Sequence, residues 1–163
     1  MQAQQQITGW HIRNWGAWGW LETAVKAIGI VAGLVALTQA LSSDPSTVTG
    51  LANIAAIAIL GLLTLAYAGV VFIRLSQREI ASLIFAISNA LGHLGMLLYL
   101  IRTPEPNMLP VVLGVAFIVG ELVKQRFLTV TGFTENGLQS AQMVMFSRVV
   151  MGIYLIFTVL VLV

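Results

Sequence analysis

The side chains best suited to chemistry in this sequence are those of Asn89 and His93. They lie four residues apart in the apolar segment 80–101, so they share one face of a helix. Neutral imidazole is a common metal ligand and proton relay. Two interpretations stay open for His93: a hydrogen-bonded packing residue, or a ligand-binding or proton-path residue. Asn53, in segment 51–73, is the neighbour expected for it from another helix.

Glu121 and Arg148 form the second candidate set. They fall on consecutive apolar segments at similar depth, one or two turns from the same membrane face, counting about 1.5 Å per residue. Ionisable groups at membrane depth are costly and are functional candidates by default. We predict that the two side chains form an intramembrane ion pair. Two alternatives stay open: Glu121 transfers a proton or an ion, or both side chains extend separately to the membrane interface. Glu22 and Lys26, also four apart, are interpreted as an interfacial pair.

The sequence does not contain the residues or motifs that several kinds of chemistry require. It contains no cysteine, which excludes disulfides, thiolate catalysis and Cys-ligated metals. It also lacks a Gly-rich phosphate loop, an HExxH motif, paired carboxylates and a Ser–His–Asp set within the membrane. We therefore expect no enzymatic activity and no metal site, and the sequence names no cofactor. Its Lys and Arg residues form no cluster, which argues against a nucleic-acid partner.

The composition indicates that lipid is the solvent. Hydrophobic residues make up 58% of the chain and charged residues 9%, whereas soluble domains carry about a quarter charged residues. A helical span needs about 20 apolar residues, and five segments satisfy this. They are residues 20–41, 51–73, 80–101, 108–127 and 141–163. The predicted fold is an all-α bundle of five transmembrane helices. Pro110 and Glu121 weaken the fourth segment, and a re-entrant segment there would leave four spans.

Charge distribution predicts the orientation. In short loops, Lys and Arg mark the cytoplasmic side, and here they gather on the side of the N-terminus, with Arg102 alone on the other. We expect a cytoplasmic (inner) membrane protein with the N-terminus inside and the C-terminus outside. Residues 1–19 are expected to form a separate interfacial segment before the bundle of residues 20–163, anchored at the headgroups by four indoles. These are Trp10, Trp15, Trp18 and Trp20.

Small residues at spacing four predict close helix packing. Gly29 and Gly33 form one such stripe, and Gly61 and Gly69 belong to another. Packing within the chain, self-association and packing on partner subunits all fit these stripes. Three functions follow as hypotheses. The first is a non-catalytic accessory or scaffold subunit of a larger, energy-transducing membrane complex. The second is a small transporter or channel that uses the intramembrane polar residues. The third is a binder of a quinone, pigment or lipid.

Overall fold

The computed structural model describes residues 11–43, 50–102 and 108–163. A 3-10 turn, η1 (Ile12–Asn14), precedes five α-helices in the described residues. These are α1 (Gly16–Ser42), α2 (Leu51–Gln77), α3 (Ile80–Arg102), α4 (Met108–Thr131) and α5 (Ser140–Leu160). The prediction of an all-α bundle with five spans is confirmed, since each helix is long and apolar enough to cross a membrane.

The fourth segment forms one continuous helix that is long and apolar enough for a full span. Helix α4 has 24 residues, which at 1.5 Å per residue gives about 36 Å against a hydrocarbon core of about 30 Å. Pro110 lies in its first turn, where the missing backbone N–H has no intrahelical partner to lose. Helix α1 begins at Gly16, four residues before the predicted start, so Trp18 and Trp20 lie inside a helix.

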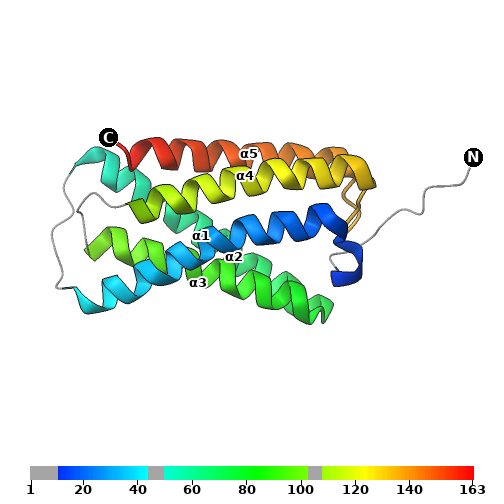
Figure 1. The fold of residues 1–163 in the computed structure, drawn as a ribbon, viewed down its shortest axis with the longest axis horizontal. Coiled ribbons are helices and arrows are strands. Elements are labelled where there is room, and N and C mark those ends of the chain that lie inside the picture. Colours follow the sequence, from blue (N-terminus) through cyan, green and yellow to red (C-terminus); the bar gives the residue numbers. More distant parts are fainter. Residues whose placement is uncertain (1–10, 44–49, 103–107) are drawn as a thin grey trace, which may run out of the picture.

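The five helices surround one axis (Figure 1). Neighbouring pairs are α1 with α3, α3 with α2, α2 with α5, α5 with α4, and α4 with α1. Helices α2 and α5 contact each other far less than the other pairs. The α2–α5 seam is thus the loosest wall of the bundle.

We call the end of the bundle that holds the start of α1, the α2–α3 link and the α4–α5 loop the basic end. We call the other end the opposite end.

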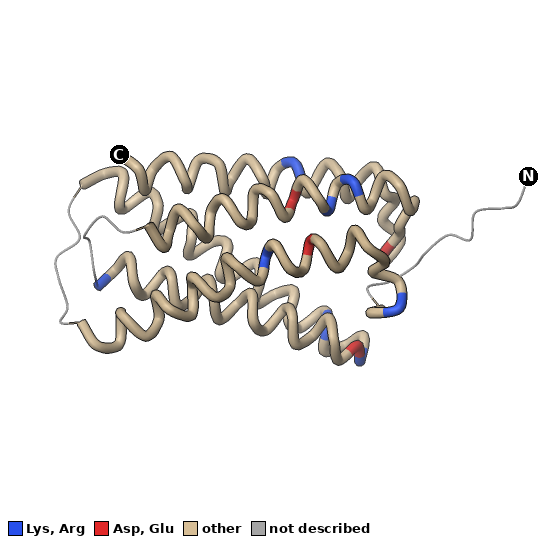
Figure 2. The backbone as a smooth tube through the Cα atoms, viewed as in Figure 1, with Lys and Arg blue, Asp and Glu red and all other residues tan. Residues whose placement is uncertain are grey.

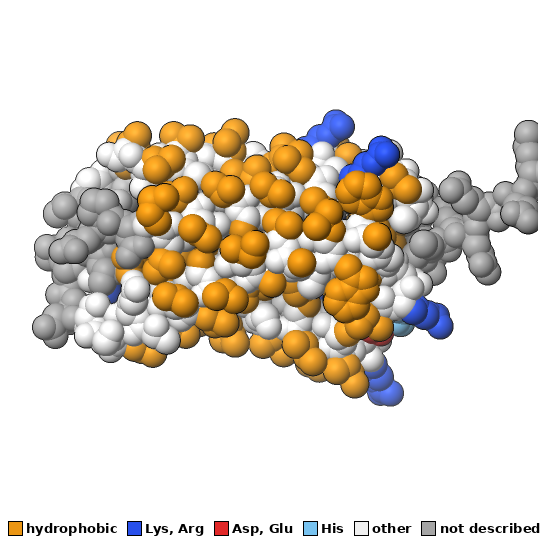
Figure 3. Space-filling view, viewed as in Figure 1, with side chains coloured by type: hydrophobic (Ala, Val, Ile, Leu, Met, Phe, Trp, Pro, Cys, Tyr) orange, Lys and Arg blue, Asp and Glu red, His pale blue; other side chains and the backbone are white. Residues whose placement is uncertain are grey.

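The outer surface of the helices is largely apolar. Large apolar side chains face outward along the helices, among them Phe72 at 73% exposure and Leu62 at 69%, and Figure 3 shows them covering the length of one face. Lys and Arg gather toward the basic end (Figure 2), with Arg102 at the end of α3 on the opposite side. A long apolar surface with charges near its ends is what a bilayer accommodates.

Helices α1 and α3 cross at a contact between backbones. A Cβ built at Gly33 would collide with the backbone carbonyl of Gly92. A Cβ at Gly95 would collide with the carbonyl oxygen of Gly33 and lie 2.7 Å from Leu37 Cβ. The predicted role of the Gly33 stripe in close packing is therefore confirmed for this pair. On α2, by contrast, a Cβ at Gly61 or Gly69 would meet nothing within 4 Å.

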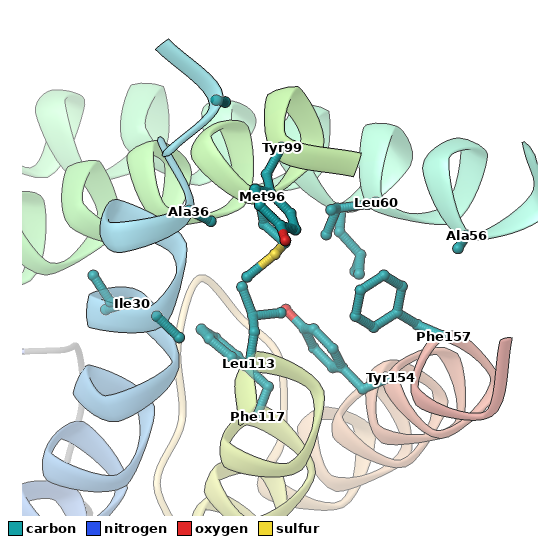
Figure 4. Close-up of a cluster of buried hydrophobic side chains, with 13 residues drawn as sticks. Ile30, Ala36, Ala56, Leu60, Met96, Tyr99, Leu113, Phe117, Tyr154 and Phe157 are labelled. Carbon is teal, nitrogen blue, oxygen red and sulfur yellow. The ribbon is translucent and has the colours of Figure 1, made fainter. Parts of the chain in front are cut away.

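The opposite-end half of the bundle is filled by apolar side chains (Figure 4). Leu113 and Phe117 of α4 and Tyr154 and Phe157 of α5 point toward Met96 of α3. Each of these five side chains has 0% exposure. These side chains make this half of the bundle a close-packed and mainly apolar core.

Candidate functional site

Most of the buried polar side chains lie in the half of the bundle nearer the basic end and at its middle, while Thr158 lies near the other end of α5. Those with low exposure in the described residues are Glu22, Lys26, Ser82, Asn89, His93, Glu121, Ser147 and Thr158. A charge buried in protein is tolerated when it is paired and hydrogen-bonded. The contacts among these residues therefore show how the helices hold them.

Four of these residues form an ion-pair cluster, namely Glu22, Lys26, Glu121 and Ser147. Lys26 Nζ donates to Glu22 Oε1 at 2.7 Å and to Glu121 Oε1 at 2.5 Å. Ser147 Oγ donates to Glu121 Oε2 at 2.6 Å. The cluster joins α1, α4 and α5, and its two carboxylates share one ammonium group. Burying such a network costs desolvation free energy, and replacing one of its members lowers the free energy of unfolding strongly because an unpaired charge stays buried.

A glycine makes room for the lysine of this cluster. A Cβ built at Gly120 of α4 would lie 2.6 Å from Lys26 Cγ and 2.8 Å from Lys26 Cε. The Lys26 stem therefore lies directly against the α4 backbone, and its ammonium group reaches Glu121 one residue further along. The absence of a side chain at position 120 is part of the geometry of the ion pair.

A hydrogen-bonded chain of rings lies next to this cluster. His93 Nδ1 is 2.7 Å from the backbone carbonyl oxygen of Asn89, which can only accept, so Nδ1 donates. His93 Nε2 is 2.6 Å from the Tyr154 hydroxyl, which is 3.1 Å from the Tyr67 hydroxyl. The Phe117 ring packs edge-on against His93, with centroids 4.7 Å apart. Both ring nitrogens of His93 are thus engaged within the chain, which favours its packing role over metal or haem ligation.

A cavity of about 330 Å³ lies between the helices on the basic-end side of this chain. That volume falls within the range of small-molecule sites. Its walls are mostly apolar, with the ion-pair cluster on one side. Its lining includes Trp15, Glu22 and Lys26 of η1–α1, Leu63, Tyr67 and Val70 of α2, Phe85, Ala86 and Asn89 of α3, Glu121 of α4, and Phe146, Ser147 and Val150 of α5.

Two acceptor atoms in the cavity wall have no hydrogen-bond partner among the described residues. They are Glu22 Oε2 and Asn89 Oδ1, and both are buried. The Asn89 amide is oriented by its Nδ2, which donates 2.8 Å to the carbonyl oxygen of Phe85. Because a carbonyl oxygen can only accept, the amide nitrogen of Asn89 must face Phe85, and the amide oxygen of Asn89 therefore points away from it. An unpaired buried acceptor costs about 1–3 kcal/mol, so this pair of atoms needs an explanation.

The α4–α5 loop closes the cavity at the basic end. Asn136 and Gly137 both have positive φ, 50° and 79°, and the flanking Glu135 and Leu138 exchange backbone hydrogen bonds. This is the geometry of a type I′ turn, for which Asn-Gly is the preferred sequence. The turn presents the Glu135 carboxylate to the Arg74 guanidinium of α2 in an ion pair. The loop and α2 are therefore held together over the cavity.

The structure corrects the predicted Glu121–Arg148 ion pair. Glu121 pairs with Lys26 and Ser147, while the Arg148 side chain is exposed. Successive residues of a helix point about 100° apart, so an inward Ser147 turns Arg148 outward. The predicted Glu22–Lys26 pair is present, and both side chains are buried inside the bundle, with exposed fractions of 3% and 4%. Lys26 is the cation that Glu121 requires.

Two other expected placements change as well. Asn53 precedes Tyr67 by 14 positions on α2, about 21 Å along the axis, and it is Tyr67 that stacks on His93 with centroids 4.4 Å apart. Asn53 is therefore not the neighbour of His93.

The tryptophans do not behave as one group. Trp15 is 4% exposed and packs on Phe85 in the cavity wall, so it is not a surface anchor. Trp18 and Trp20 are 38% and 52% exposed near the start of α1, where the interfacial prediction stands. Trp10 lies outside the described residues.

Comparisons with protein-family models, with curated proteins and with solved structures find no match to this chain.

We expect Tyr154→Phe to lower the free energy of unfolding more than Tyr67→Phe. Tyr154 is the middle member of the ring chain, and its loss leaves both His93 and the Tyr67 hydroxyl without it. An orphaned buried group costs about 1–3 kcal/mol, against about 1 kcal/mol for a typical hydrogen bond. Thermal unfolding followed by circular dichroism in detergent measures both. Equal losses of unfolding free energy in the two variants would contradict the central position of Tyr154 in the hydrogen-bonded series.

Proposed function

We propose that this protein is a non-catalytic binder of a small amphipathic molecule, held inside the bundle on the cytoplasmic side of the membrane. The observation that carries the proposal is the cavity with two unpartnered buried acceptors, Glu22 Oε2 and Asn89 Oδ1, among apolar walls. Ligand sites are typically apolar clefts with a few convergent polar groups. The basic end supports the cytoplasmic assignment through the positive-inside rule.

The loose seam between α2 and α5 supports entry from the lipid. Val70 of α2 and Phe146 and Val150 of α5 line the cavity, and these two helices contact each other less than the other neighbouring pairs. A lipophilic molecule dissolved in the leaflet reaches the cavity by separating this pair. The polar end of the molecule lies toward Glu22 of α1 and Asn89 of α3, which also line the cavity.

A through-channel is less well supported. Of the intramembrane polar residues Asn89, His93, Glu121 and Arg148, only Asn89 and Glu121 border the cavity. Arg148 is exposed at the surface. His93 is fully buried behind hydrogen bonds to Tyr154 and the α3 backbone. Beyond His93 the core of the described residues consists mainly of apolar side chains, with Thr158 as a buried polar one. A polar route across the whole membrane needs a different conformation.

A role as an accessory subunit is the second candidate, and one observation favours it. Helix α2 is the least buried of the five spans, and Gly61 and Gly69 on it contact nothing that a Cβ would disturb. Glycines in membrane helices commonly serve close helix approach. A partner helix on α2 gives these two glycines such a role.

One experiment separates these functions. The protein is purified from its own membranes in a mild detergent, and the bound small molecules and proteins are identified by mass spectrometry. The binder proposal predicts about one small molecule per chain in the wild type, above a detergent blank. It predicts loss of that molecule in Ala86→Phe, which fills the cavity from a wall residue that is 4% exposed. A stoichiometric protein with no small molecule favours the subunit role instead.

The matched control is Ala58→Phe, which adds the same ring on the outward face of α2 and keeps the small molecule. Circular dichroism checks that each variant is folded. If Ala86→Phe does not fold, Val70→Phe tests the same cavity from a half-buried wall position. A wild-type extract indistinguishable from the blank would contradict the proposal.

A further inference from the structure

Polar contacts join α2 to the α4–α5 side of the bundle at both ends of the cavity. In the middle of the bundle, the hydroxyl oxygens of Tyr67 on α2 and Tyr154 on α5 are 3.1 Å apart. At the basic end, the Arg74 guanidinium of α2 forms an ion pair with the Glu135 carboxylate of the α4–α5 turn. Tyr67 and Arg74 are seven residues apart, which places them on one face of α2 with about 10 Å between them along its axis.

The wall between these two contacts is apolar. Val70 on α2 and Phe146 and Val150 on α5 line the cavity at this level, and the Phe146 side chain is 52% exposed. In a membrane, apolar side chains gain little from leaving lipid for each other, since the lipid tails are equally apolar. This stretch therefore holds α2 and α5 together weakly, and the polar contacts at its two ends keep the seam closed.

The basic-end contact is a bidentate ion pair in the cavity wall. Arg74 Nη2 donates to Glu135 Oε2 at 3.2 Å, and Arg74 Nη1 donates to Glu135 Oε1. Arg74 Nη1 also donates to Gln77 Oε1 at 2.7 Å, and Gln77 Nε2 donates to Asn136 Oδ1 of the turn at 3.3 Å. Paired charges in this geometry form the stronger class of hydrogen bonds. Both charged side chains line the cavity.

The turn that carries Glu135 is fixed to α4 and α5. The buried Phe133 ring packs on the Phe127 ring of α4, with centroids 5.3 Å apart. Ser140 Oγ of α5 donates to the Leu128 carbonyl oxygen of α4 at 2.5 Å. Helix α2, by contrast, is the least buried of the five spans. When the ion pair breaks, the basic-end part of α2 is therefore the wall that moves.

We propose that the Arg74–Glu135 ion pair is a latch that controls access to the cavity. While the latch is formed, the basic-end part of α2 stays against the α4–α5 turn. When it breaks, α2 separates from α5 along Val70 and Phe146, and a lipophilic molecule passes between the leaflet and the cavity. The Tyr67–Tyr154 contact limits the opening to the basic-end half. The inference rests on the proposed function, since it concerns access to the same cavity.

The test measures how often the cavity opens. The chain has no cysteine, so Ala86→Cys places a single thiol in the cavity wall, at a position that is 4% exposed. The protein in nanodiscs is reacted with N-ethylmaleimide and followed by mass spectrometry of the intact chain. The rate reports the open population when opening is fast relative to the reaction. We expect Arg74→Met to raise this rate at least about tenfold, equivalent to about 1.4 kcal/mol.

A charge reversal tests the pair itself. Arg74→Glu alone places two carboxylates against each other and should also speed the reaction, while Arg74→Glu combined with Glu135→Arg should return it toward the parent rate. If Arg74→Met does not fold, Glu135→Gln breaks the same pair from the turn.

Two controls separate the latch from a general loss of stability. Arg78→Met is the same change one turn further along, at an exposed residue outside the cavity lining, and should leave the rate unchanged. Ala56→Cys places the thiol instead on α2 in the core of the opposite end, where the side chain is 0% exposed. This thiol should react equally slowly with and without Arg74→Met.

Each outcome decides the proposal. Faster reaction at Ala86→Cys alone, reversed by the charge swap, supports the latch. An unchanged rate in both Arg74→Met and Glu135→Gln overturns it, and so does equal acceleration at Ala56→Cys, which would mean global unfolding. The reaction needs no native molecule. A wild-type extract without a bound small molecule therefore contradicts the binder function, whereas the latch is judged on these rates.

Discussion

Replacing Lys26 with methionine is expected to lower the free energy of unfolding by about 3–5 kcal/mol, the usual cost of breaking a buried ion pair. Lys26 is the shared donor to Glu22 and Glu121, at 2.7 and 2.5 Å. Methionine fills a similar volume beside Gly120 and removes the ammonium group. Two carboxylates then remain in a bundle interior with no cation between them. Denaturant or SDS titration in micelles, read by circular dichroism, measures the loss.

We expect that a second set of substitutions restores stability to Lys26→Met. If the loss arises from uncompensated carboxylates, the triple variant Glu22→Gln, Lys26→Met, Glu121→Gln should recover part of the stability, because it removes the two unpaired buried charges. Arg148→Met is the control, since its side chain is exposed and such changes usually stay within about 0.5 kcal/mol. A Lys26→Met loss no larger than that of Arg148→Met would contradict the ion-pair cluster.

The buried face of α3 could be read from the sequence, because its residues follow the spacing that a packed helix imposes. Asn89 and His93 are both buried, as their four-residue separation and apolar surroundings predicted. The partner of His93 could not be read in the same way. Tyr154 comes from α5, and nothing in the sequence states that α5 and α3 face each other across the bundle.

The ion-pair cluster was missed because depth was counted from the wrong residue. From a helix start at Trp20, Lys26 lies within two turns of the interface. Helix α1 starts at Gly16, and Lys26 is then about 15 Å into it. A signal was present, since these charges continue the buried small-residue stripe of α1 at alternating spacings of four and three. The stripe is Glu22, Lys26, Gly29, Gly33, Ala36 and Ala40.

The choice between Ser147 and Arg148 shows the limit of periodicity. Helix α5 is apolar on most faces, so its pattern does not fix the rotation of the helix about its own axis. A shift of one residue exchanges an inward hydroxyl for an inward guanidinium. The packing of α5 on α4 selects Ser147, whose hydroxyl reaches Glu121, and Arg148 points outward. From residue types alone, the charged Arg148 is the expected partner of Glu121. The packing of α5 instead turns Ser147 inward.

Gly33→Ala is expected to destabilise the bundle by about 3 kcal/mol, the upper end of the cost of overpacking. An added Cβ collides with the carbonyl oxygen of Gly92 and would lie 2.7 Å from Gly92 Cα. These are backbone atoms that no rotamer change can move, so α1 and α3 must separate along their crossing.

Helix propensity alone predicts the opposite sign, since alanine is favoured over glycine by about 1 kcal/mol in a helix interior. Gly61→Ala is the matched control, because its Cβ meets nothing within 4 Å, and it should be neutral or stabilise slightly. Thermal unfolding of the two variants side by side measures the difference. Similar midpoints would contradict the close backbone contact between α1 and α3. That contact fixes which face of α1 points inward, and therefore where Glu22 and Lys26 lie.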